Sequence, residues 1–151
     1  GAGDQVRLDI AQAAAQQLKE VGIDCTVEVP TEVDWGGQMA YLIGWGSPFD
    51  ADDHTYKVFG TDKGANYSSY SNALVDQYLI EARESADPAV RAEAYDKFQE
   101  ELAKDPAFTF ICYIDANYVA NSSIQGISAD TVMGHHGVGI FWNVADWTIG
   151  N

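Results

Sequence analysis

The sequence predicts an α/β fold, with a layered sheet and flanking helices. An amphipathic helical pattern near the N-terminus leads directly into an alternating, strand-like segment. Two further amphipathic helices precede a strongly apolar segment of strand length. The predicted order is helix, strand, strand, two helices and strand, which is typical of layered α/β domains rather than of bundles or sandwiches. The 151 residues can bury a core of their own, so residues 1–151 are expected to form a single domain.

The first helix is predicted to run from Asp4, a capping residue, to about Val21. Its apolar face repeats at helical spacing and comprises Ile10, Ala14, Leu18 and Val21. Gly22 follows, at the position where a glycine commonly ends a helix. Apolar and polar residues alternate from Ile23 to Val29, which predicts a strand that Pro30 stops.

A short apolar run from Met39 to Ile43 predicts a buried strand, and Gly44 closes it. From Trp45 to Tyr70 the pattern becomes irregular, with many Gly, Pro, Asp, Asn and Ser residues and scattered aromatic ones. So long a loop inside a compact domain is usually functional or mobile. Its aromatic content favours a functional role.

Two helices are predicted after this loop. The apolar face of the first comprises Leu74, Val75, Tyr78, Leu79 and Ala82. The second opens at Asp87-Pro88, a cap followed by a proline in the first turn, and ends before Asp105-Pro106. Its buried residues are expected to be Val90, Ala94, Phe98 and Leu102. A strand from Ala107 to Ile114 follows, and short glycine-containing segments come after Asn121.

The composition excludes several classes of partner. The formal net charge is −15, from 23 acidic and 8 basic residues, and this field repels phosphate backbones and anionic headgroups. A nucleic-acid partner is therefore not expected. No apolar run approaches the roughly 18 residues that a membrane span needs. The two cysteines, Cys25 and Cys112, are far apart in sequence, so their pairing stays open.

The segment from Gly44 to Asp50 is the strongest candidate for a binding loop. It directly follows a predicted strand, and ligands of open α/β sheets gather at the carboxyl ends of strands. Glycines here let a guest approach the backbone closely. Trp45 and Phe49 offer flat apolar faces, and an indole N–H adds a donor.

Catalytic and metal-binding alternatives have weaker support in the sequence. Asp50, Asp52 and Asp53 form an acidic cluster that a small hydrolase could use as acid and base, although capping of the loop is the simpler interpretation. No recognisable nucleophile, phosphate loop or cofactor motif accompanies them. Adjacent histidines such as His135-His136 point to opposite faces of a strand, so no metal site is expected.

Several motifs, in order and spacing, resemble the second lobe of the family 5 solute-binding proteins, the dipeptide, oligopeptide and nickel binders of ABC importers. The matching segments cover roughly residues 4–126 and include Leu18-Lys19-Glu20-Val21-Gly22-Ile23, Leu42-Ile43-Gly44-Trp45-Gly46-Ser47-Pro48-Phe49-Asp50, and Asn66-Tyr67-Ser68-Ser69-Tyr70-Ser71-Asn72. Asp105-Pro106 before an apolar strand continues the match.

This resemblance implies one lobe of a type II periplasmic-binding-protein-like fold, the C-terminal fragment of a larger two-lobed protein. Its expected partners are the N-terminal lobe of the same parent chain, a small-molecule or peptide solute, and an ABC permease. The expected location is periplasmic or extracellular, and a lipoprotein anchor is compatible with it. The residues expected to bind the solute are Trp45, Ser47, Phe49, Asp50, Asn66 and Tyr67. Neither enzymatic activity nor a cofactor is expected.

The sequence departs from the family pattern in four places. A helix that full-length members carry after the stretch matching Val33-Asp34-Trp35 is missing. Pro48 stands near the position where peptide binders place an aspartate, which weakens the case for a peptide. The loop Thr61-Asp62-Lys63-Gly64 lacks the histidine of nickel binders, and Ala51 replaces the usual proline.

Overall fold

The computed structural model describes residues 4–35, 37, 39–46, 50–115, 117–128 and 139–150. The chain divides into two units, Gly1–Gly44 and Trp45–Asn151. The first unit contains helix α1 (Gln5–Glu20). The second contains α2 (Ala51–Phe59), α3 (Ala73–Glu84), α4 (Pro88–Lys104), the 3-10 segment η2 (Gly139–Asp146) and the strands β1 (Ile124–Gln125) and β2 (Thr148–Ile149). In these described parts, no helix has both the length and the apolar character needed to cross a membrane.

Helix α1 begins and ends as the sequence predicts. The Asp4 carboxylate accepts a hydrogen bond from the backbone N–H of Arg7 at 3.0 Å, and it also forms an ion pair with the Arg7 side chain. At the other end, Gly22 has a φ of 86°, a left-handed conformation that glycine adopts without steric cost. The apolar face is not covered within the described chain, because α1 has no buried residue and Val21 is 73% exposed.

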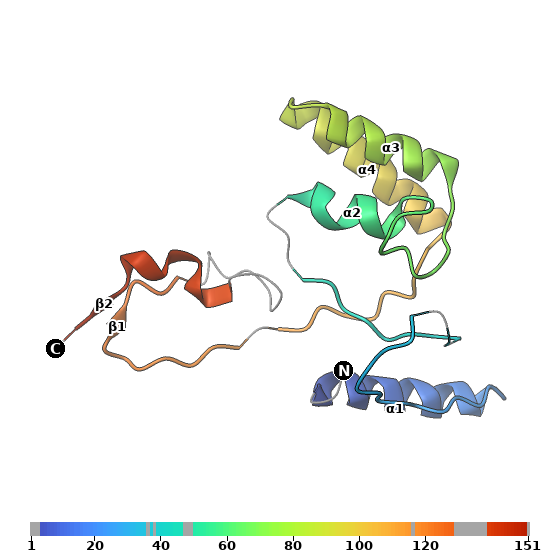
Figure 1. Cartoon of the computed structure of the whole chain (residues 1–151), viewed down its shortest axis with the longest axis horizontal. Coiled ribbons are helices and arrows are strands. Elements are labelled where there is room, and N and C mark those ends of the chain that lie inside the picture. Colours follow the sequence, from blue (N-terminus) through green and yellow to red (C-terminus); the bar gives the residue numbers. More distant parts are fainter. Residues whose placement is uncertain are drawn as a thin grey trace. The chain divides into compact units, whose positions relative to one another are not determined.

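The core of the second unit lies between α3 and α4, with α2 packed against α3 (Figure 1). Both helices of this pair were predicted, and their capping residues are Asn72 and Asp87. The residues that form this core cluster are Tyr70, Val75, Leu79, Phe98 and Leu102. Burying an aliphatic or aromatic side chain of this size contributes about 1.5–3 kcal/mol, so this cluster is the main source of stability in the unit.

Two residues assigned to this core by their spacing are exposed instead. Leu74 is 44% exposed because it lies one position, about 100° around the helix, from the buried Val75. Val90 is 47% exposed, although it shares the spacing of Ala94 and Phe98. It lies in the first turn of α4.

Helix α2 lies inside the segment that was predicted to be irregular, so that prediction is wrong. Asp50 caps the helix, and Asp52 and Asp53 place negative charge in its first turn, where the helix dipole favours it. Lys57 in the last turn completes the same charge pattern. These local signals were present in the sequence, but the surrounding glycines and prolines obscured the nine-residue helix.

The three predicted strands, Ile23–Val29, Met39–Ile43 and Ala107–Ile114, form no strand in the structure. Among the described residues, the sheet consists of β1 and β2, which pair antiparallel with Ile124 opposite Ile149. A strand is stabilised by ladder hydrogen bonds to a partner and by burial of one face. These segments have neither, since Ile111 for example is 54% exposed. The expected layered sheet is therefore absent from the described part of the chain.

The two cysteines lie in segments that were expected to be buried strands. Cys25 and Cys112 are both free and exposed in the structure.

Candidate functional site

An aromatic wall forms at the start of the second unit. The Trp45 ring stacks on the Tyr67 ring, with 6.1 Å between the ring centroids and 8° between the planes. The His54 ring of α2 lies 5.8 Å from Trp45, with the planes tilted by 46°. We refer to Trp45, Tyr67 and His54 as the aromatic wall. These separations lie within the range of favourable aromatic pairs.

Trp45 remains accessible although two rings support it. Its side chain is 38% exposed, whereas a Trp that plugs a core would be almost fully buried. Among the described residues, no group accepts a hydrogen bond from the indole N–H. The wall therefore offers a flat apolar face and one unused donor to a molecule that approaches it.

His54 is a member of the wall that sequence reasoning did not assign to the binding site. It lies four residues after Asp50, one turn into α2, and its Nδ1 atom is buried without a hydrogen-bond partner. The signal that could have found it is the capping pattern of α2. Once that helix is placed, His54 projects from its first turns, close to the end of the binding loop.

Two of the predicted site residues, Ser47 and Phe49, lie outside the described residues. Asp50 is described, and its carboxylate is engaged by the protein itself. One oxygen accepts from the backbone N–H of Asp52 at 2.8 Å, and both oxygens accept from Nη2 of Arg91 at 2.6 and 2.7 Å. The backbone hydrogen bond from Asp52, and next the hydrogen bond from Arg91, hold the pKa of Asp50 below its usual value.

The other two carboxylates of the acidic cluster are also paired with cations. Asp52 lies 3.1 Å from the Arg83 guanidinium, which covers the ring of Tyr56 at 3.8 Å. Asp53 lies 3.1 Å from the Lys57 ammonium, one helical turn away. Each carboxylate of the cluster is thus held by a different cation, an arrangement that orders the start of α2 and does not resemble an acid–base pair facing a substrate.

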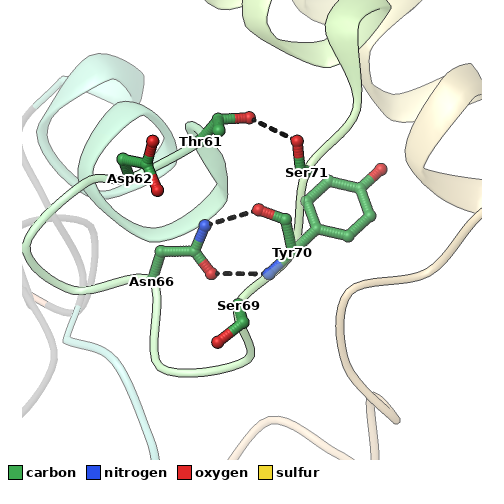
Figure 2. Close-up of a pocket in the computed structure, with 6 residues that line it drawn as sticks. All are labelled: Thr61, Asp62, Asn66, Ser69, Tyr70 and Ser71. Carbon is green, nitrogen blue, oxygen red and sulfur yellow. Dashed lines mark hydrogen bonds between the residues drawn. The ribbon is translucent and has the colours of Figure 1, made fainter.

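Asn66 and Tyr67 are adjacent in sequence but face different surroundings. Tyr67 contributes its ring to the aromatic wall. The Asn66 carboxamide points to the backbone of its own loop, where it forms a hydrogen bond with Gly60. Figure 2 shows two further hydrogen bonds of this carboxamide, both with the Tyr70 backbone. The structure therefore brings Trp45 and Tyr67 together and directs Asn66 away from them.

A small open hollow of about 140 Å³ lies in the loop between α2 and α3 (Figure 2). Its lining is polar and comprises Thr61, Asp62, Asn66, Ser69, Tyr70 and Ser71. Pockets that enclose a small-molecule ligand usually measure about 300–1,000 Å³. This hollow is too small to enclose a peptide, and neither Trp45 nor Tyr67 lines it.

Residues with metal-binding side chains do not gather in the part of the chain that the structure describes. No group of three or more His, Cys, Asp or Glu residues there could hold a metal ion. The pair His135-His136 lies outside the described residues.

Comparison with known proteins finds relatives in bacteria. The chain is 37% identical over 133 residues to Protein XP55 of Streptomyces lividans. This alignment covers 83% of the chain and 24% of Protein XP55. It is also 26% identical to the oligopeptide-binding protein AppA of Bacillus subtilis, over a 159-residue alignment. That alignment covers 96% of the chain and 27% of AppA. No protein-family model matches the chain.

A solved structure supports the same relationship. The chain is similar to NikZ from Campylobacter jejuni, whose crystal structure was determined in complex with Ni(L-His), with a TM-score of 0.80 and 33% sequence identity. The match covers 96% of this chain and 31% of NikZ. The chain thus spans roughly a quarter to a third of the relatives that it matches. The likeness in sequence and in fold confirms the resemblance drawn from the motifs: the chain is an α/β segment that belongs to the family 5 solute-binding proteins.

Proposed function

We propose that the chain is the C-terminal lobe of the substrate-binding component of an ABC importer. The relatives named as binding proteins support a role in ligand capture and not in catalysis. The partial coverage of those relatives supports a lobe that pairs with an N-terminal lobe of a type II periplasmic-binding-protein-like fold. The partner proteins would be an ABC permease and that lobe, in a periplasmic or extracellular location.

The observation that carries the proposal is the accessible face of Trp45. A ring that is supported by Tyr67 and still 38% exposed is suited to stack against a bound molecule. Closure of a second lobe over this face would remove it from water, which favours binding by the hydrophobic effect. Ser47 and Phe49, two and four positions after Trp45 in the sequence, are proposed as further solute contacts.

The relatives suggest two classes of solute. AppA is an oligopeptide-binding protein, and NikZ was crystallised with Ni(L-His). A small peptide fits the apolar wall with its unused indole donor. A nickel–histidine complex, as in NikZ, is the alternative that the experiment must separate from a peptide.

Calorimetry on the parent protein tests this proposal. The probes are a pool of random pentapeptides, Ni(II)–L-histidine, and free L-histidine as a control. The peptide pool is expected to bind, and Trp45→Ala should weaken that binding by about 2 kcal/mol or more, because the loss of a central aromatic contact commonly costs that much.

Trp142→Ala is the matched control, since Trp142 is also half exposed, at 52%, and lies outside the wall. Equal affinity of the wild type and Trp45→Ala for every bound probe would remove Trp45 from the site. Binding of Ni(II)–L-histidine alone would replace the peptide with a metal complex.

A further inference from the structure

The Asn66 side chain uses its full hydrogen-bonding capacity within its own loop. Its Nδ2 group donates to the carbonyl oxygens of Gly60 at 2.9 Å and Tyr70 at 2.7 Å. Its Oδ1 atom accepts from the backbone N–H of Tyr70 at 3.0 Å and from the Ser68 hydroxyl at 3.2 Å. A carboxamide has two donor hydrogens and two acceptor lone pairs, so no capacity remains for a solute.

The orientation of this carboxamide is fixed by the chemistry of its partners. A backbone carbonyl can only accept a hydrogen bond, and a backbone N–H can only donate one. Exchanging the oxygen and nitrogen of Asn66 would set its acceptor against two carbonyls and its donors against the Tyr70 N–H. The observed orientation is therefore the one that satisfies all partners.

These bonds tie the loop to the helical core at both ends. Gly60 is the C-cap of α2, and the Tyr70 side chain is buried in the core cluster between α3 and α4. The neighbouring Thr61 adds a hydrogen bond from its N–H to Asp76 of α3, at 2.8 Å. Within the loop, Ser69 holds a φ of 55°, a left-handed conformation that a non-glycine residue adopts only where its surroundings enforce it.

Tyr67 directly follows Asn66, so the hydrogen bonds that fix Asn66 also fix the direction in which the Tyr67 backbone leaves it. Its ring then meets the face of Trp45 with the planes 8° apart. We propose that Asn66 is a positioning residue, whose carboxamide fixes the loop between α2 and α3 and thereby holds Tyr67 against Trp45 without contacting the solute. That the Trp45–Tyr67 pair binds a solute rests on the proposed function. That Asn66 holds Tyr67 against Trp45 does not depend on it.

Hydroxyl-radical labelling of the parent protein, read by mass spectrometry at each Trp without any solute, tests the positioning role. Asn66→Asp keeps the shape of the side chain but replaces two donor hydrogens by an oxygen that faces two carbonyls. Labelling of Trp45 should rise about two- to threefold, because the 38% exposed side chain loses the support of Tyr67. Labelling of Trp142 should not change.

Pentapeptide affinity, measured on the same variants, separates positioning from direct contact. Asn66→Asp should weaken binding by about tenfold through lost preorganisation, and Ser68→Ala, which removes one exposed bond of the four, should weaken it much less. If Asn66→Asp does not fold, Asn66→Ser replaces it. The same labelling and affinity measurements then test the positioning role.

Unchanged Trp45 labelling in a folded Asn66 variant would overturn the positioning role. Weaker binding together with unchanged labelling would identify Asn66 as a direct solute contact, which also overturns it. A third outcome separates the two proposals. If Trp45 labelling rises in the Asn66 variant but the Trp45→Ala variant binds the peptides with wild-type affinity, the positioning role stands and the proposed function is refuted.

Discussion

At the scale of single residues, the polar side chains next to the aromatic wall are committed to the protein itself. Asp50 caps α2 and pairs with Arg91, and Asn66 saturates its carboxamide within its own loop. Trp45 is different, because its indole N–H is unused among the described residues and its face is accessible. All three residues are candidate ligand contacts in the sequence. In the structure they differ in how many hydrogen-bonding groups remain available to a ligand.

The pairing of Asp50 with Arg91 predicts a pH-dependent contribution to stability. The pKa of Asp50 is lowered in the folded chain by the Asp52 backbone N–H and by Arg91. The stabilisation is therefore fully present above the unfolded carboxyl pKa of about 3.9 and is lost as the pH falls through the lowered folded value. Urea unfolding at pH 7 should show wild type more stable than Asp50→Asn, and this difference should shrink as the pH is lowered toward 2.

Asp50→Ala provides the comparison, because asparagine still caps a helix and alanine does not. Asp50→Ala should be the less stable of the two variants at pH 7. A difference between wild type and Asp50→Asn that is the same at both pH values would contradict the role of the ion pair.

At the scale of elements, local signals were sufficient to predict three helices and insufficient to predict strands. Caps, apolar spacing and a left-handed glycine mark α1, α3 and α4 in the sequence itself. Strand formation depends on a partner elsewhere, and Ala107–Ile114 has none among the described residues despite its apolar composition. Helix α2 was missed because its caps lie within a glycine- and proline-rich stretch.

The same distinction explains how much of the site could be predicted. The sequence singled out Trp45 and Tyr67 as candidates but could not show that their rings stack, because they lie 22 positions apart with a missed helix between them. It also could not show that Arg91, 41 positions from Asp50, occupies that carboxylate. Contacts between distant positions require the fold.

The packing of α3 against α4 predicts a large effect of one buried residue. Leu79 is 1% exposed in the core cluster, so Leu79→Ala should lower the free energy of unfolding by about 2–5 kcal/mol in denaturant titrations. The control is Leu74→Ala, because Leu74 is 44% exposed on the same helix and should cost less than about 1 kcal/mol. Equal losses for the two variants would show that the helix packs on a different face.

At the scale of the whole molecule, the described chain leaves much apolar surface uncovered. Tyr113 and Val119 are fully exposed, and Phe110 is 66% exposed, and all three lie within or shortly after the predicted strand Ala107–Ile114. Isolated apolar residues on a surface are common, but a run of them is unusual for a protein that acts alone. This surface agrees with the proposal that the chain is one lobe of a larger binding protein.

The proposal that Trp45 faces a bound solute is tested most directly by labelling the parent protein with hydroxyl radicals in the presence and absence of the probe that calorimetry shows to bind. Labelling of Trp45 should fall several-fold on saturation, as its 38% exposed side chain is covered, while labelling of Trp142 stays constant. Labelling of Trp45 that is the same with and without saturating solute would contradict the account.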